Sequence, residues 1–167
     1  MSQTVNMEGQ PVSLKGSFPQ IGDQVKDFSL VSQTLEDVDL QNFIGQRKIL
    51  NIIASIDTGI CAMSVRRFEQ MSAQLHNTSV LCISADLPFA HARFTHRENL
   101  ERVVMLSTLR DKQFKTDYGV DIQSGVLAGL CARAVIILDE QNKVLYSELV
   151  SDIIHEPDYQ RAIAVLA

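Results

Sequence analysis

ILNIIASIDTGICAMSVRR, residues 49–67, is the stretch that decides the fold of this chain. Its first six residues are apolar except for Asn51, a pattern typical of a buried strand. Apolar side chains then recur at roughly helical spacing on both sides of Cys61 and beyond it. The pattern therefore predicts a central strand over 49–54, a helix over 60–75, and a cysteine at the junction between them.

A cysteine in the first turn of a helix meets unpaired backbone N–H groups and a partial positive charge, and both favour a thiolate over a thiol. The helix dipole stabilises an anion by only about 0.3–1 kcal/mol at an exposed site. An ordinary thiol, with a pKa of about 8.5, stays largely protonated at neutral pH, so the helix alone is not sufficient. Thr58, three residues before Cys61, can turn its hydroxyl toward the same site. We expect a cation from elsewhere in the chain.

The composition is that of an ordinary globular protein, and 167 residues with 46% hydrophobic content predict one domain over residues 1–167. A net charge of −5 and a pI near 5.3 argue against nucleic acid as a partner. No apolar run is long enough to cross a membrane, and the N-terminus lacks the pattern of a secretory signal. Three cysteines without a CxxC pair favour a reducing compartment, so we predict a cytoplasmic protein.

Along the rest of the chain, short apolar runs alternate with helical patterns and turn residues. The predicted order is a hairpin over 5–14, short strands over 28–31 and 38–40, the central strand and helix, a strand over 79–84, a helix over 87–97, a strand over 103–106, a short helix over 111–118, a loop over 120–130, a strand pair over 132–138 and 144–150, and a final helix to 166. This order predicts an α/β, thioredoxin-like fold, with an N-terminal β-hairpin and a central mixed β-sheet flanked by helices on both faces.

Four segments carry a family resemblance: Thr4-Val5, the run 48–67 with its SIDTG and SVR motifs, LCISADLPFA at 81–90, and ARAV at 132–135. They resemble the peroxiredoxin superfamily, and most closely its bacterial thiol peroxidase (atypical two-cysteine) subgroup. The resemblance covers nearly the whole chain, including the N-terminal hairpin. It implies a thiol-dependent peroxidase acting on alkyl or lipid hydroperoxides and on hydrogen peroxide.

The resemblance also implies the site residues. Cys61 would be the peroxidatic nucleophile, whose thiolate attacks the peroxide and becomes a sulfenic acid. Thr58 would hydrogen-bond the thiolate and the peroxide, and Arg133 would supply the missing cation. Thioredoxin is the implied reductant, and a homodimer with its active-site loops at the interface is the implied assembly. No cofactor is implied.

Two positions depart from the subgroup. The resemblance implies a proline at the position of Ala54, shielding the cysteine from water, so Ala54 is expected to loosen the pocket. It also implies a resolving cysteine at the position of Thr95, and threonine cannot form a disulfide. The resolving thiol is therefore unknown. Three routes stay open: Cys131, which an extended strand would turn to the same face as Arg133; an external thiol; or a bridge between subunits.

The sequence also allows interpretations other than a peroxidase. A thioredoxin-like redox sensor or binding module is the alternative function, favoured by Ala54 and Thr95 and opposed by the intact Thr58, Cys61 and Arg133. A disulfide oxidoreductase needs a CxxC pair, which the sequence lacks. Core packing is predicted for Cys82, within an apolar strand. The four histidines, at 76, 91, 96 and 155, are scattered and predict no metal site.

Overall fold

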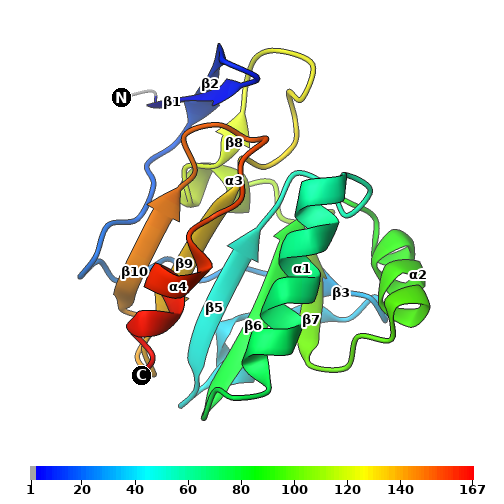
Figure 1. The fold of residues 1–167 in the computed structure, drawn as a ribbon, viewed down its shortest axis with the longest axis vertical. Helices are drawn as coiled ribbons and strands as arrows, with labels where there is room; N and C mark the ends of the chain where they lie inside the picture. Colours follow the sequence, from blue (N-terminus) through cyan, green and yellow to red (C-terminus); the bar gives the residue numbers. More distant parts are fainter. Residues whose placement is uncertain (1–2) are drawn as a thin grey trace.

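A mixed sheet of seven strands forms the centre of the molecule in this computed structural model, which describes residues 3–167 (Figure 1). Its strands in spatial order are β10 (Val144–Leu149), β9 (Ala134–Leu138), β5 (Arg47–Ile52), β6 (Thr78–Ser84), β7 (Val103–Ser107), β3 (Leu30–Ser32) and β4 (Asp37–Val38). β5, β6 and β7 run parallel, while β9 and β3 flank them as antiparallel neighbours. The predicted thioredoxin-like arrangement is confirmed.

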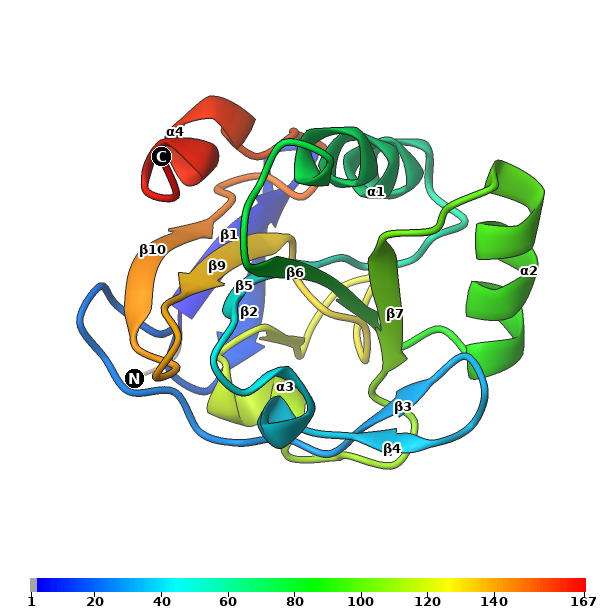
Figure 2. The ribbon, with the colours of Figure 1, turned by 90° about the horizontal axis from the view of Figure 1, so that it is seen from below.

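Helices cover both faces of this sheet (Figure 2). α1 (Gly59–Ser72) links β5 to β6, α2 (Pro88–Glu98) links β6 to β7, and α4 (Tyr159–Ala164) follows the sheet; all three contribute to the core on one face. α3 (Phe114–Asp117) and the 3₁₀ turn η1 (Leu40–Phe43) pack against the opposite face. The β5–α1–β6 connection places the start of α1 at the carboxyl end of the central strand, where α/β folds commonly bind their ligands.

Side-chain alternation along the strands explains the two cores. In β9, Val135 and Ile137 pack toward α1, whereas Ala134, Ile136 and Leu138 pack toward the other face. Successive residues of a strand point to opposite faces, so a strand buried on both sides must be apolar throughout. This requirement is why the sequence of the central strands lacks a polar alternation.

A second, three-stranded sheet is formed by β1 (Gln3–Met7), β2 (Gln10–Lys15) and β8 (Asp121–Ile122). The N-terminal hairpin is confirmed, and its turn at Glu8-Gly9 has positive φ at both residues (51° and 79°), the conformation of a tight hairpin turn. The predicted loop over 120–130 was incomplete, because it contains β8. A two-residue strand paired with β2, more than a hundred residues earlier, leaves no local periodicity to detect.

Other boundaries also differ from the prediction; for example, β5 spans Arg47–Ile52 rather than 49–54, and α4 ends at Ala164 rather than at 166. α1 ends at Ser72 rather than at 75. The helix expected over 111–118 is reduced to α3, because the Asp111 side chain accepts the backbone N–H groups of Gln113 and Phe114 and holds that segment as a turn. β9 begins at Ala134, after Arg133. Within residues 3–167, no helix has the length and apolar character needed to cross a membrane.

Candidate active site

The strand–helix junction lies where the sequence predicts it. β5 ends at Ile52, the turn 55–58 follows, and α1 begins at Gly59 with Thr58 as its N-cap residue. Cys61 is the third residue of α1 and is fully buried. Backbone N–H groups in this first turn have no acceptor within the helix, so they favour negative charge at Cys61.

The Thr58 hydroxyl has a defined orientation. It donates to the backbone oxygen of Ser55 (3.1 Å) and makes no capping bond to the first turn of α1. The hydroxyl hydrogen is therefore committed to Ser55, while the Thr58 oxygen keeps its capacity to accept. The first-turn N–H groups are likewise left without a side-chain cap.

A pocket of about 190 Å³ brings the three predicted site residues together. Thr58, Cys61 and Arg133 line it along with a mostly apolar wall: Met7, Ala54, Gly59, Ile60, Leu127, Ile153 and Ile154. These wall residues come from the N-terminal hairpin, the junction, the 120–130 loop and the segment after β10, which meet only in the folded chain. Sequence reasoning missed Met7, Leu127, Ile153 and Ile154, because no motif or local spacing marks them.

Arg133 is a buried cation without a carboxylate partner. Its side chain is only 2% exposed, and its Nε and Nη2 atoms both donate to the backbone oxygen of Ile153 (3.0 and 2.8 Å). Its Nη1 atom is buried and has no hydrogen-bond partner. Among residues 3–167, no carboxylate lies within ion-pair distance of Arg133.

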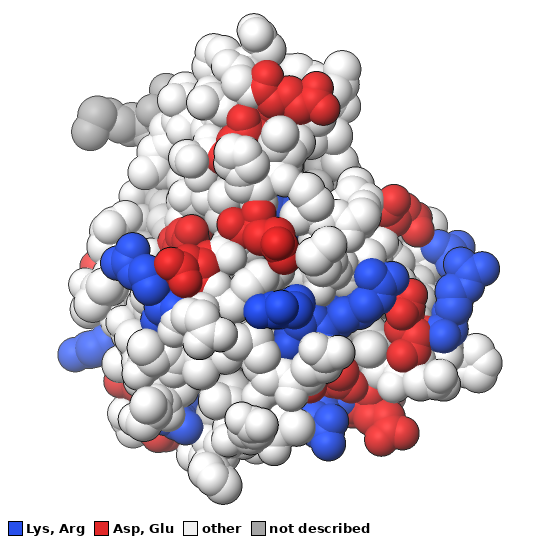
Figure 3. All heavy atoms as spheres, in the orientation of Figure 1, with Lys and Arg blue, Asp and Glu red and all other residues white. Residues whose placement is uncertain are grey.

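Other arginines of the molecule are placed differently. Lys and Arg side chains form a band across the middle of the face that carries α1, with Asp and Glu side chains close by (Figure 3). Arg66 of α1, for example, forms a bidentate pair with Glu98 (2.8 and 2.9 Å) at the surface. Exposed ion pairs of this kind require little desolvation and contribute little to the free energy of unfolding. A buried guanidinium with a free N–H donor is costly, so Arg133 is the cation that needs an explanation.

The other two cysteines lie outside this pocket. Cys82 is buried within β6, where it accepts a hydrogen bond from Asn51 Nδ2 (3.7 Å), and burial raises its pKa to about 12. The predicted core position of Cys82 is confirmed. Burial also raises the pKa of Cys131 to about 12. Cys131 packs into the core on the opposite side of the sheet from Cys82 and does not line the pocket that Arg133 lines.

The expectation that Cys131 and Arg133 share a face depended on a regular strand through both residues. Because β9 begins at Ala134, the alternation rule does not reach them. Thr95 lies on α2, 7% exposed, with its hydroxyl near Gln33 Oε1 (3.0 Å) and the Ala92 backbone oxygen (3.1 Å). All three cysteines are free thiols.

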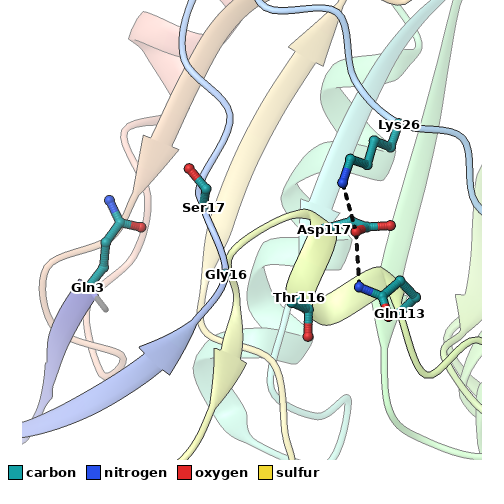
Figure 4. Close-up of a pocket in the computed structure, with 7 residues that line it drawn as sticks. All are labelled: Gln3, Gly16, Ser17, Lys26, Gln113, Thr116 and Asp117. Atoms are coloured by element: carbon teal, nitrogen blue, oxygen red, sulfur yellow. Dashed lines mark hydrogen bonds and ion pairs between the residues drawn. The ribbon is translucent and has the colours of Figure 1, made fainter. Parts of the chain in front are cut away.

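A larger hollow, of about 640 Å³, lies elsewhere (Figure 4). Its lining is Gln3, Gly16, Ser17, Lys26, Gln113, Thr116 and Asp117. Three of these side chains are paired with one another, because Asp117 Oδ1 accepts from both Lys26 Nζ (3.3 Å) and Gln113 Nε2 (3.2 Å). It contains no nucleophile with an activating neighbour. Within the described chain, no group of three or more His, Cys, Asp or Glu side chains is arranged to hold a metal ion.

The fold and this pocket define a cysteine-based redox protein of the thioredoxin-like class. Comparisons with known proteins sharpen that class. The family model named Redoxin matches residues 20–163. A thiol peroxidase of Corynebacterium glutamicum is 45% identical over 161 residues, covering 96% of this chain and 97% of the relative.

Solved structures agree. A peroxiredoxin-like protein from Aquifex aeolicus superposes with a TM-score of 0.90 at 32% identity, covering 99% of this chain and 96% of that one. A thiol peroxidase from Chromobacterium violaceum has a TM-score of 0.88 at 28% identity, covering 98% and 94%. The chain therefore belongs to the redoxin family and, within it, to the thiol peroxidases. It is an enzyme, a thiol-dependent peroxidase.

Proposed function

We propose that Cys61 is the nucleophile of this peroxidase and that Thr58 and Arg133 act directly on the reacting atoms. The strongest support is the unpartnered Nη1 of Arg133, in the pocket that Arg133 shares with Cys61. A buried cation without a carboxylate is unfavourable unless an anion balances it. The Cys61 thiolate, and then the negative charge that develops on the peroxide, supply that anion.

The first step oxidises Cys61. The thiolate sulfur attacks the terminal oxygen of the hydroperoxide, and the S–O bond forms as the O–O bond breaks. The electron pair of the broken bond goes to the leaving oxygen, which takes up one proton and departs as an alcohol, or as water when the substrate is hydrogen peroxide. Arg133 Nη1 stabilises the charge on that oxygen, and Cys61 becomes a sulfenic acid.

Thr58 orients the peroxide in this proposal. Because its hydroxyl hydrogen is committed to the Ser55 backbone oxygen, Thr58 Oγ1 accepts a hydrogen bond from the peroxide O–H. This role is narrower than the one that the family resemblance implies, in which Thr58 also bonds the thiolate. A fixed acceptor on one side and a fixed donor, Arg133, on the other align the O–O bond with the sulfur.

The pocket favours organic hydroperoxides as substrates. Its wall is formed largely by apolar side chains, and a volume of about 190 Å³ admits the reacting end of a ligand rather than a whole lipid. We propose that an alkyl or lipid hydroperoxide places its head against Cys61 and its chain along Met7, Leu127 and Ile154. Hydrogen peroxide fits the same site without the apolar contacts.

An external thiol completes the cycle. With a pKa of about 12, only about one Cys131 thiol in 10⁵ is ionised at pH 7, and the thiolate is the reactive form. Cys82 is equally protonated and faces α1 rather than the pocket. We therefore favour direct attack of a reductant thiol, such as that of thioredoxin, on the sulfenic sulfur; this step releases water and leaves a mixed disulfide, which a second thiol reduces.

Assembly and location are also part of the proposal. Val126 and Ile154 are exposed apolar side chains beside the pocket residues Leu127 and Ile153, which supports a homodimer that covers this edge. Three free cysteines support a reducing compartment, and we place the reaction in the cytoplasm.

The test is one equivalent of an organic hydroperoxide followed by intact mass measurement and trapping of sulfenic acid. We expect one added oxygen at Cys61, no loss of Cys82 or Cys131 thiols, and no reaction in Cys61→Ser. Cys82→Ala is the matched control and should be oxidised like the wild type. Peroxide consumption by Cys61→Ser at the wild-type rate would contradict the proposal that Cys61 is the nucleophile. Loss of two thiols within one chain would reject the external-thiol route and leave the nucleophile in place.

A further inference from the structure

The turn that carries Thr58 is hydrogen-bonded to a carboxylate on another segment. Asp86 follows β6, and its Oδ1 accepts the hydroxyl of Ser55 (2.7 Å) while its Oδ2 accepts the backbone N–H of Ile56 (2.9 Å). Asp86 does not line the pocket that contains Cys61, and its side-chain hydrogen bonds go to the turn and to Ser84. We propose that Asp86 is a positioning residue for the peroxidase reaction, because it fixes the Ser55–Thr58 turn; this inference rests on the proposed role of Cys61 and Thr58.

The path from Asp86 to the reacting atoms is a short chain of hydrogen bonds. Ser55 Oγ, held by Asp86, accepts the N–H of Asp57 (3.1 Å), so Asp57 is linked to Asp86 through the Ser55 hydroxyl. The backbone oxygen of Ser55 then accepts both the hydroxyl and the N–H of Thr58 (3.1 and 3.2 Å). Moving Ser55 would therefore move the Thr58 oxygen and the start of α1 together.

Asp86 is itself held in place by hydrogen bonds with Ser84 and Ser107. Its Oδ2 accepts the hydroxyl of Ser84 at 2.5 Å, a distance typical of an O–H donor to an ionised carboxylate. Its backbone N–H bonds Ser84 Oγ (3.2 Å), and its backbone oxygen accepts the hydroxyl of Ser107 (2.6 Å). A side chain locked at both its carboxylate and its backbone is suited to hold a catalytic turn in place.

His91 sets the direction of this network. Its Nε2 lies 2.8 Å from Ser84 Oγ, and the ring is completely buried on α2. Since the single Ser84 hydroxyl hydrogen is committed to Asp86, His91 Nε2 must be the donor in its contact with Ser84. Its Nδ1 is buried without a partner, as expected for the bare nitrogen of a neutral ring, and burial lowers the pKa of His91 to about 4. Hydrogen bonds are therefore donated from His91 to Ser84 and from Ser84 to Asp86, and the turn donates to the same carboxylate through Ser55 and Ile56.

The buried carboxylate of Glu69 provides a matched comparison. Glu69, at the far end of α1, accepts the backbone N–H groups of Glu101, Arg102 and Val103, with distances of 2.5 to 3.0 Å. Like Asp86 it holds a segment in place through backbone N–H groups, yet it has no contact with the 55–58 turn. Replacing Glu69 measures how much stability is lost with a purely structural carboxylate. Replacing Asp86 measures that loss and, in addition, the effect of the turn's position on the oxidation rate.

The experiment measures the second-order rate of Cys61 oxidation by an organic hydroperoxide in Asp86→Asn, Ser55→Ala and Glu69→Gln, together with the rate of Cys61 alkylation by iodoacetamide. We expect Asp86→Asn to slow peroxide oxidation about 10- to 100-fold, as seen for groups that orient a reacting residue. Alkylation, which needs no oriented peroxide, should change by less than about threefold. Glu69→Gln should keep the wild-type oxidation rate at an equal or larger loss of thermal stability.

Ser55→Ala provides a second test if Asp86→Asn does not fold, because it removes the hydroxyl link between the turn and Asp86 and leaves the carboxylate and its bond to the Ile56 N–H. In the double variant the two losses should not multiply, since both act through the same hydrogen bond. Wild-type oxidation rates in Ser55→Ala, or in a folded Asp86→Asn, would overturn the inference, as would an equal loss in Glu69→Gln. Failure of the wild type to form a sulfenic acid at Cys61 would instead overturn the proposed function.

Discussion

Cys61 and Cys82 are buried to the same degree in the same core, yet their surroundings differ completely. Both are 0% exposed and both pack on the α1 face of the sheet. Cys82 lies inside a strand, where one amide from Asn51 is the only polar group bonded to it in the described chain. Cys61 lies in the first turn of a helix, at a pocket that also contains Thr58 and Arg133. Exposure therefore does not distinguish the proposed nucleophile from a core cysteine; the groups around each sulfur do.

Alkylation gives the largest expected contrast between the two cysteines. At pH 7 the Cys82 thiolate is about one part in 10⁵, so iodoacetamide should label Cys61 at least about 10³-fold faster than Cys82. Labelling of Cys82 should rise about tenfold per pH unit as the pH approaches 12. Peptide mass spectrometry over a time course at several pH values measures both rates. Comparable labelling of the two cysteines in the folded protein would contradict the comparison, and unfolding in denaturant should equalise them.

Removing the cation should have the next largest effect. Arg133→Met takes away the donor to the leaving oxygen, and we expect oxidation of Cys61 to slow about 10²- to 10³-fold, the scale of losing one preorganised donor. Thermal stability should be retained, because the variant removes a buried charge that has no carboxylate partner. Stopped-flow kinetics and a melting curve are the two measurements.

Arg67→Met is the control for the loss of an arginine. Arg67 lies on α1 and stacks over the ring of Tyr159, 5.0 Å from its centroid, outside the pocket. Its loss should leave the oxidation rate within about twofold of the wild type. If both variants slowed oxidation equally, surface charge rather than a placed donor would explain the rate.

Thr58 should matter less than Arg133. Thr58→Val removes the proposed hydrogen bond to the peroxide, and a loss of about 1.4–2.7 kcal/mol predicts oxidation about 10- to 100-fold slower. Thr58→Ser keeps the hydroxyl and should recover most of the rate. Because Thr58 makes no capping hydrogen bond, Thr58→Val should melt near the wild-type temperature. A serine variant as slow as the valine variant would argue for the shape of the turn instead of the hydroxyl.

Cys82 should also limit stability in alkali. Its pKa is raised in the folded state, so above pH 9 the unfolded chain loses this proton first and stability falls as the pH rises toward 12. The slope is about 1.4 kcal/mol per pH unit for one group. Urea unfolding between pH 8 and 11 should show a shallower decline in Cys82→Ala. An unchanged slope would mean that Cys82 ionises freely in the folded protein.

Cys131 should have the smallest effect. Cys131→Ala should turn over with an external thiol within about twofold of the wild-type rate, because a buried, protonated thiol does not take part in resolution. Steady-state peroxide consumption checks this expectation. A variant that oxidises normally once but fails to turn over would identify Cys131 as the resolving thiol.

Much of the fold was readable because the signals are local. The apolar run 49–54, the spacing behind Cys61 and the turn residues after β9 each lie within one window of sequence, and the elements they predict are present. The misses share one cause. β8 exists only through pairing with β2, and the shortened α3 results from hydrogen bonds of the Asp111 side chain that no periodicity records.

The candidate site shows the same division. Residues of one motif, Thr58 and Cys61, can be placed from sequence because four residues of turn and helix allow few arrangements. Arg133 was found through a family resemblance and not through spacing. The expected pairing of Arg133 with Cys131 depended on an alternation that stops at Ala134. The hydrogen bond between Ser55 and Asp86 joins residues 31 positions apart, and no sequence pattern links them.

The sequence by itself therefore determined the class of fold, the position of the cysteine at a helix start and the need for a cation, because backbone geometry and the weakness of a helix dipole are local physics. Only the tertiary structure decided which groups surround the sulfur. It left Arg133 Nη1 unpaired beside the pocket, directed the Thr58 hydroxyl to Ser55, and kept Cys131 and Cys82 protonated in apolar cores. Desolvation and hydrogen-bond geometry depend on packing between distant segments, and these two properties are what distinguish the proposed nucleophile from the other two buried cysteines.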